Sequence, residues 1–395
     1  MSIDNFPPTR TSALARINAV RPSDYARSRN ALEGAVSYLS PYITHGLVSL
    51  PEVLSGVTSH YALDAQHKFV NELGWREYFH HVWQFRGAEI FTNLHEGPLP
   101  ESDYAKILPA DIRIGATGVP VIDMAVRTLY DTGYLHNHAR MWLASYVVHI
   151  RKVHWRCAAD WLYGHLLDGD LASNHLSWQW VAGTGSTKPY LFNAENVQRY
   201  APSAWHSPGS VIDQSYEMLD HIARQPLHHK RNTHEISHAD SIGIEPPLST
   251  TPPKDVLLTA PDKAAVTGLD VWLVHPWNLG ELPTMLPVGT VVVGILLTDF
   301  HRAWPWSERR WRFVTNRMAE LTSVRWLADA ATIGAALTEA RSVRTIDDPH
   351  LKPWLSHLAY CQPAPALFAA VDRCCNSFSQ WWRRASRGEI QHLIK

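Results

Sequence analysis

The sequence predicts a mainly helical N-terminal half, followed by a smaller α/β domain with a parallel, Rossmann-like sheet. Apolar residues recur with the 3.6-residue helical period up to about residue 202. Short β-branched runs alternate with helical patterns from residue 268 onward. A polar stretch rich in Pro and His separates the two regions. We therefore expect a helical domain over 1–202, a linker over 203–267, and an α/β domain with C-terminal helices over 268–395.

Two segments illustrate the helical half. "QHKFVNELGWREYFHHVW" at 66–83 and "HARMWLASYVVHIRKVHW" at 138–155 each repeat apolar residues at helical spacing. In the second segment, Met141, Ala144, Val148 and Trp155 fall near one face. Each segment is therefore predicted to be one amphipathic helix.

The second half reads as alternating strands and helices. Continuous β-branched runs, typical of buried parallel strands, are "DVWLVH" at 270–275 and "TVVVGILL" at 290–297. Helices are predicted over 306–321 and near 330–340, and further strands over 323–329, 342–347 and near "ALFAAV" at 366–371. This alternation favours a small parallel sheet covered by helices.

Composition limits the possible functions. The chain has 395 residues, a formal net charge of −1 and 45% apolar residues, so a protein that is basic throughout and binds nucleic acid in bulk is excluded. The longest apolar run, 289–298, is about half a membrane span. The first residues show no apolar signal region, and the four cysteines lack CxxC spacing. We expect a monomeric cytoplasmic protein that does not enter a membrane, and its 17 Trp favour an aromatic cofactor or a base-stacking surface.

One stretch, "HLLDGDLASNHLSWQW" at 165–180, concentrates polar and aromatic groups. It holds Asp168 and Asp170, an amide at Asn174, and indoles at Trp178 and Trp180. Paired acids can bind a metal or divide acid and base roles. They can also simply cap and turn the chain, since "DGD" is a turn signal. The neighbouring residues offer few further oxygen ligands, so no metal site is predicted here.

Four stretches in order resemble the DNA photolyase and cryptochrome family. They are "LSPYITHG" at 39–46, "NELGWREYFHH" at 71–81, "TGYLHNHARMWLAS" at 132–145 and "DGDLASNHLSWQW" at 168–180. The likeness covers roughly residues 20–202. It implies a helical domain that binds FAD, with UV-damaged DNA, duplex or single-stranded, as the partner. It also implies light-driven repair of cyclobutane pyrimidine dimers by electron transfer from reduced FAD. A blue-light photoreceptor with the same site, or a module that binds damaged DNA without repair, are the alternatives.

The resemblance assigns residues to FAD. On the phosphate side it implies Tyr25, Ser37, Tyr38, Leu39, Ser40 and Arg76, around the flavin ring it implies Asn137, Arg140, Asp168, Gly169, Asp170 and Asn174, and it adds Phe69 as a further FAD contact. Hydroxyls before a helix and a fixed guanidinium charge suit a diphosphate. Arg140 and Asp168 are expected to pair beside the ring, and Asn174 is expected to face the flavin N5.

The resemblance also assigns catalytic and substrate residues. Trp155 and Trp178 match the inner part of an electron-hopping chain, and with Asn174 and Glu72 they form the predicted catalytic set. The residues implied for the damaged bases are Glu72, Trp75, Asn137, His138, Met141 and Trp180. Flat indole faces suit a base that has left the stack.

The chain departs from the family pattern at several positions. Val36 replaces a common Thr, Phe69 a common Trp, and His138 the Arg usual in dimer photolyases. The third Trp of the electron chain is not found near Ser102, and Tyr104 or Trp83 are the substitutes considered. The α/β domain also follows the flavin domain, which resembles a circular permutation. No antenna motif is found, so a second chromophore stays unassigned.

A competing motif lies in the predicted linker. "HEISH" at 234–238 matches the HExxH zinc-protease pattern, with Glu235 as the base. The surrounding segment is polar and lacks the apolar helix face that buries such a site, so a chance match is favoured over proteolysis. Adventitious metal binding by His228, His229, His234 and His238 is the alternative.

Overall fold

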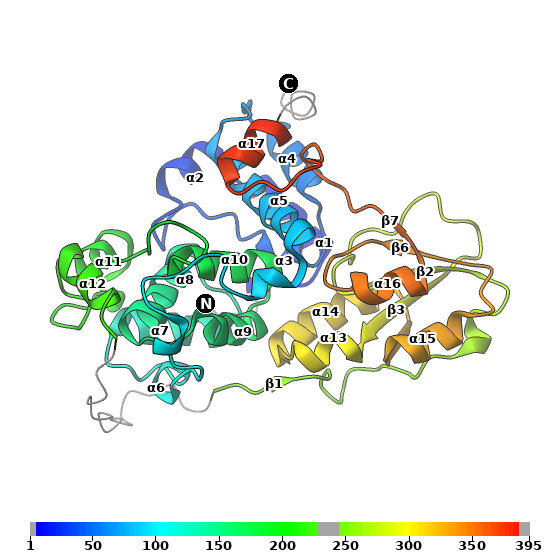
Figure 1. The fold of residues 1–395 in the computed structure, drawn as a ribbon. Helices are drawn as coiled ribbons and strands as arrows, with labels where there is room; N and C mark the ends of the chain where they lie inside the picture. The colour runs from blue at the N-terminus through cyan, green and yellow to red at the C-terminus, as the bar shows by residue number, and fades with distance from the viewer. Residues whose placement is uncertain (1–4, 227–244, 387–395) are drawn as a thin grey trace. The chain divides into compact units, whose positions relative to one another are not determined.

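The computed structural model describes residues 5–226 and 245–386. The chain forms two compact units that alternate along the sequence. Unit 1 contains Arg21–Val36 and Phe79–Pro246, and unit 2 contains Phe6–Val20, Ser37–Tyr78 and the chain from Pro247 onward. Figure 1 shows helices in both units and the sheet in the C-terminal half of the sequence. A mainly helical fold with a smaller parallel sheet is thus confirmed.

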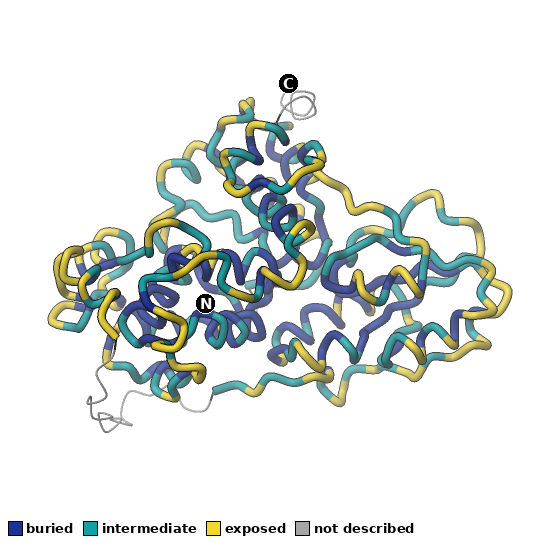
Figure 2. The backbone as a smooth tube through the Cα atoms, viewed as in Figure 1, coloured by how far each residue is buried: buried dark blue, intermediate teal, exposed yellow. Residues whose placement is uncertain are grey.

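Unit 1 is helical throughout its described part. Its helices are α2 (Pro22–Ser28), the C-terminal part of α5 (Lys68–Arg86), α6 (Ala110–Arg113), α7 (Pro120–Thr132), α8 (Asn137–Ser145), α9 (Trp155–His165), α10 (Leu171–Ala182), α11 (Ala194–Tyr200) and α12 (Tyr216–Ala223). Buried residues of α7 to α10 form one hydrophobic core, visible as the dark segments of these helices in Figure 2. Trp142, Trp155 and Trp178 belong to that core.

The predicted helix over 138–155 is wrong in its second half. Helix α8 ends at Ser145, a π-helical turn covers Tyr146–Ile150, and Trp155 begins α9. The break occurs where Lys152 adopts a left-handed backbone conformation with φ of 52°. Its buried ammonium donates to Ile222 O and Ala223 O at 2.7 and 2.8 Å, at the end of α12. This long-range contact holds the chain out of the helical conformation.

Part of the predicted linker is folded. Ser203–Trp205 forms a 3₁₀ turn, and Ser215 caps α12 by accepting from the amide of Met218. Leu219 and Ala223 of α12 are buried, which the polar composition of the segment did not indicate. The division into three consecutive parts stays a prediction. The "HEISH" motif lies outside the described residues.

The helices of unit 2 come from both ends of the sequence. They are α1 (Arg10–Ala19), α3 (Ser40–Thr44), α4 (Leu50–Thr58), most of α5, α13 (Thr298–Ala303), α14 (Glu308–Leu321), α15 (Ala330–Leu337), α16 (Lys352–Leu358) and α17 (Phe378–Ala385). Helix α4 begins with a capping box, in which Ser49 accepts from the amide of Glu52 and Glu52 accepts from the amide of Ser49. No helix within 5–226 or 245–386 is long and apolar enough to span a membrane.

The sheet of unit 2 is parallel, as predicted. Its strands are β2 (Asp270–Val274), β3 (Val291–Leu297), β5 (Val324–Ala328), β6 (Ser342–Ile346) and β7 (Tyr360–Gln362), in the order β5-β3-β2-β6-β7. All four pairings are parallel. The chain moves from β2 to β3 on one side and from β6 to β7 on the other. The adjacent pair β2 and β6 is therefore the topological switch point of a doubly wound sheet.

Two strand assignments differ from the sequence prediction. "ALFAAV" is not a strand, because the amides of Leu367 and Phe368 donate to the carboxylate of Glu77 on α5 at 2.6 and 3.1 Å. Trp306 and Ser307 form the short strand β4 (Trp306–Ser307), antiparallel to β1 (Leu248–Ser249), so α14 begins only at Glu308.

Candidate functional site

The predicted pair beside the flavin ring forms within unit 1. Arg140 Nη2 donates to both carboxylate oxygens of Asp168, at 2.9 and 2.7 Å, and Arg140 Nε donates to Leu135 O at 2.7 Å. The Asp168 side chain is 4% exposed and that of Arg140 is 24% exposed. The contact itself is confirmed. The contact fixes the guanidinium in the first turn of α8. Because the pair is largely buried, its electric field can act on a ring bound beside it.

Asp170 is both a helix cap and a partner of histidine. Its Oδ1 accepts from the amide of Ser173 at 2.7 Å, which caps α10, and its Oδ2 lies 2.8 Å from Nε2 of His80. The capping alternative for this acid is therefore confirmed. Gly169 before it is buried and donates its amide to Leu166 O. Sequence reasoning missed His80, although it lies inside the quoted "NELGWREYFHH" stretch.

Asn174 and the two inner tryptophans are held in the interior of unit 1. Asn174 Nδ2 donates to Ala159 O at 2.8 Å, so its Oδ1 is directed away from that carbonyl. Trp155 Nε1 donates to Asn93 Oδ1 at 2.7 Å, and the indoles of Trp155 and Trp178 are 2% and 3% exposed. Trp180 differs, because it is 42% exposed. The structure thus separates two buried indoles from one surface indole, and the roles predicted for them stay predictions. Nothing local in the sequence indicated Asn93.

Tyr104 has an aromatic neighbour that leads to Trp155. Its ring centroid lies 6.3 Å from that of His154, which lies 5.7 Å from that of Trp155. Burial raises the pKa of Tyr104 to about 12. Trp83, the other residue considered for the third position, packs instead edge-on against His80 at 6.1 Å. Both residues stay candidates for the third position.

The residues predicted for the damaged bases differ in exposure. Asn137 is exposed, and its amide lies 3.6 Å from the sulfur of the half-buried Met141. His138 is 8% exposed and packs against Trp142 at 5.1 Å and Tyr200 at 4.9 Å. Burial, reinforced by Arg29, lowers the pKa of His138 to about 4, so this imidazole is neutral at pH 7. It cannot supply the positive charge that an Arg would.

The predicted phosphate-side residues lie on α2 in unit 1 and around α3 in unit 2. Tyr25 is half-buried on α2. Tyr38 has a left-handed backbone with φ of 52°, and its pKa is raised because burial outweighs the nearby Arg16. Ser37 and Ser40 are half-buried and flank Tyr38 and the buried Leu39, and α3 starts at Ser40. The strained Tyr38 separates the two serines and turns the chain into the helix.

Helix α5 adds three predicted residues in unit 2. Phe69 is 2% exposed. Glu72 forms an ion pair with Lys68 at 2.9 Å. Arg76 Nη1 donates to Thr44 Oγ1 at 3.1 Å, which joins α5 to the end of α3. Helix α3 therefore orients the Arg76 guanidinium at its C-terminal end and carries Ser40 at its N-terminal end.

Trp75 has an unexpected partner. The ring of Phe378 on α17 is stacked on it, with centroids 4.1 Å apart and planes 9° apart. The sequence predicted Trp75 as a wall for a displaced base. The structure instead covers a face of this indole with the chain's own C-terminal helix, and only a contact more than 300 residues away in sequence produces this packing.

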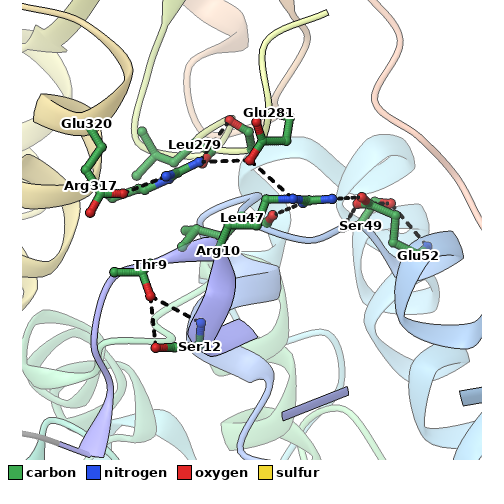
Figure 3. Close-up of polar contacts among 11 residues, drawn as sticks. Thr9, Arg10, Ser12, Leu47, Ser49, Glu52, Leu279, Glu281, Arg317 and Glu320 are labelled. Carbon is green, nitrogen blue, oxygen red and sulfur yellow. Dashed lines mark hydrogen bonds and ion pairs between the residues drawn. The ribbon is translucent and has the colours of Figure 1, made fainter. Parts of the chain in front are cut away.

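The segment from α3 to α4 is held by a network of charges in unit 2 (Figure 3). Arg10 Nη1 donates to Leu47 O at 2.6 Å, and its guanidinium pairs with Glu52 at 2.5 Å and with Glu281 at 3.3 Å. Arg317 on α14 lies 3.7 Å from the same Glu281 carboxylate and donates to Leu279 O at 2.9 Å. Residues far apart in sequence therefore meet on the loop after β2.

Comparison with known proteins finds similarity over part of the chain. Residues 69–244 match the family model described as the FAD binding domain of DNA photolyase. A deoxyribodipyrimidine photo-lyase of Streptomyces griseus is 36% identical over 213 residues, which cover 50% of this chain and 46% of that protein. The deoxyribodipyrimidine photo-lyase of Escherichia coli is 30% identical over 241 residues, which cover 54% of this chain and 50% of that protein.

The chain thus spans about half the length of the curated relatives it matches. Among solved structures, a cryptochrome of Synechocystis sp. PCC6803 is 28% identical, with a TM-score of 0.44, and covers 50% of this chain and 44% of that one.

Proposed function

We propose, from the membership of residues 69–244 in the photolyase family of FAD-binding domains, that this protein is a blue-light-driven deoxyribodipyrimidine photolyase. Reduced FAD, when bound and excited by light, would supply the electron that splits a cyclobutane pyrimidine dimer and would regain it afterwards. The protein would supply binding, orientation and a dry environment. We also propose a monomer that acts on UV-damaged DNA in the cytoplasm.

The donor set fits FAD. In unit 1, Arg140, Asp168, Asp170 and Asn174 offer a guanidinium, two carboxylates and an amide oxygen, which match the N–H and C=O groups at the edge of a flavin ring. In unit 2, Ser37, Ser40 and Arg76 offer hydroxyls and a fixed positive charge, which suit a diphosphate. Asn174 is the group proposed to face N5, since its amide orientation is fixed by Ala159 O.

The single observation that carries the proposal is the family match over residues 69–244, a stretch that contains the paired Arg140 and Asp168 as well as Asn174. The test is to illuminate the fully reduced, FAD-loaded protein with an oligonucleotide that contains one pyrimidine dimer. Recovery of the pyrimidine absorbance supports repair. No recovery, with the flavin still fully reduced, removes the repair activity.

Two buried indoles are proposed to relay electrons toward the flavin site. Trp178→Phe should slow the photoreduction of oxidised flavin at least about tenfold, because Phe is much harder to oxidise than Trp. Trp180→Phe is the matched control, since Trp180 lies at the surface and should leave this rate unchanged. Equal rates in wild type and Trp178→Phe would contradict the proposed relay.

A cryptochrome-like photoreceptor is the second candidate. Two residues predicted to contact damaged bases, His138 and Trp75, are instead engaged with the chain's own aromatic rings. That observation favours a site that binds FAD without repairing DNA. Photoreduction without repair in the oligonucleotide assay would select this candidate.

A further inference from the structure

In unit 2, side chains from two loops of the chain itself lie at the carboxyl edge of the sheet. In doubly wound sheets, ligands bind outside the carboxyl ends of the strands at the switch point, here between β2 and β6. The loops that follow these two strands bind each other. Trp277 after β2 is stacked on His350 after β6, with centroids 4.4 Å apart and planes 11° apart. Trp277 and His350 are only 5% and 3% exposed, so protein side chains fill this edge.

The loop after β2 also holds the predicted phosphate segment. His45, which follows α3, is fully buried, and its Nδ1 donates to Pro276 O at 2.6 Å. The amide of Leu279 donates back to His45 O at 2.9 Å. The imidazole also packs against Phe313 at 5.5 Å and Trp306 at 6.1 Å. His45 is therefore fixed on both its backbone and its side chain by the α/β part of unit 2.

The backbones approach closely at the next residue. Gly46 has a φ of 66°, and a methyl group there would lie 2.5 Å from Trp277 O. A methyl group on Gly280 would lie 2.7 Å from Gly46 O. This double approach tolerates only glycine at both positions. The charge network of Arg10, Glu281 and Arg317 joins the neighbouring Leu47 to the same loop, because Arg10 donates to Leu47 O and pairs with Glu281, while Arg317 donates to Leu279 O (Figure 3).

We propose that the loop 275–281 positions α3 for FAD, with His45 as the positioning residue, and that the carboxyl edge of the sheet serves this purpose in place of a ligand of its own. The proposal rests on the proposed FAD site. Helix α3 has five residues, so a shift at His45 reaches Ser40 over about 7 Å of helix axis. The same helix end orients Arg76 through Thr44.

The test compares FAD affinity in three variants of the full chain. His45→Phe keeps a ring but leaves Pro276 O without its donor, and should weaken FAD binding to the flavin-free protein about tenfold. His45→Asn can place an amide donor near the lost Nδ1, and should restore affinity to within about threefold of wild type. Leu355→Ala, a buried residue of α16 in the same unit, should lower the unfolding midpoint and leave FAD affinity unchanged.

A flavin-free measurement separates this proposal from the FAD assignment. Amide hydrogen exchange at residues 42–48 should accelerate in His45→Phe and not in Leu355→Ala. The positioning role would be overturned if His45→Phe left either the exchange or the FAD affinity unchanged. It would also be overturned if Leu355→Ala lost as much FAD affinity as His45→Phe. If the wild-type protein bound no FAD while exchange accelerated as expected, the FAD site would fail and only the anchoring of α3 would stand.

Discussion

Gly46→Ala offers a direct measure of how tightly the loop after β2 holds the segment after α3. The left-handed φ of 66° costs an Ala about 1 kcal/mol. The added methyl would also lie 2.5 Å from Trp277 O and 3.1 Å from Asn278 Cα. Both contacts are with backbone atoms, which cannot rotate away, so overpacking adds about 2 kcal/mol. The expected loss in the free energy of unfolding of unit 2 is about 3 kcal/mol.

Gly268→Ala is the matched control in the same unit. Gly268 has a φ of 73°, but a methyl group there would meet no atom within 4 Å. This variant carries only the backbone cost of about 1 kcal/mol. Urea unfolding followed by far-UV circular dichroism measures the difference, and the transition shifted by Gly268→Ala identifies unit 2. With a slope of about 2 kcal/mol per molar urea, Gly46→Ala should unfold about 1 M earlier than Gly268→Ala. Equal midpoints for both variants would refute the close packing at Gly46.

Three further predictions concern unit 1. Burial lowers the pKa values of His136 and His138 to about 4, whereas the same imidazoles in the unfolded chain take up protons near pH 6.5. The free energy of unfolding is therefore undiminished by these residues above pH 6.5 and decreases as the pH falls toward 4. Each histidine should lower the free energy of unfolding by about 2 kcal/mol at pH 5, relative to neutral pH. His138→Gln should therefore flatten the pH dependence of the urea midpoint. Asp168→Asn should lower the free energy of unfolding by about 3 kcal/mol because it leaves the Arg140 charge without a carboxylate partner, whereas Asp24→Asn, in an exposed pair, should lower it by less than about 1 kcal/mol, both measured by calorimetry. Lys152→Met removes the donor to two carbonyls of α12, so hydrogen exchange at 216–223 should become faster. Unchanged exchange would contradict this capping role.

Elements set by local pattern were predictable from sequence. Helix α5 and the strands β2, β3, β5 and β6 follow the apolar period and the β-branched runs. The break before α9 was not predictable, because Lys152 is held by carbonyls 70 and 71 residues further along the chain. The "ALFAAV" segment was misassigned for a similar reason, since its amides donate to Glu77, 290 residues earlier. The hydrophobic period of a segment carries no information about hydrogen-bond partners so far away in the sequence.

The candidate site divides in the same way. The pairing of Arg140 with Asp168 followed from the family resemblance and is present. The contacts of Asp170 with His80 and of Trp155 with Asn93 were missed, because no spacing rule links residues 90 or 62 positions apart. His45 was quoted within a motif, but its partner Pro276 lies 231 residues away. Motifs therefore indicated which residues matter and left open what holds them.

Helix α5 shows how one motif can serve two purposes. At about 100° per residue, Phe69, Glu72 and Arg76 share one face of the helix, and Gly74, Glu77 and Tyr78 share the opposite one. The second face binds the chain's own C-terminal segment. A methyl group on Gly74 would lie 2.5 Å from the Trp382 ring, Tyr78 packs edge-on against Phe378 at 5.8 Å, and Glu77 accepts two amides.

Trp75 lies between these two faces, and Phe378 stacks on its indole, so this predicted substrate residue also belongs to the packing surface for α17. A helix with a partner on both faces has no single apolar stripe, so its composition does not separate binding residues from packing residues. Part of "NELGWREY" is therefore required for folding of unit 2, and loss of FAD binding in a variant of Gly74 or Glu77 would report on packing of α17, not on contact with the cofactor.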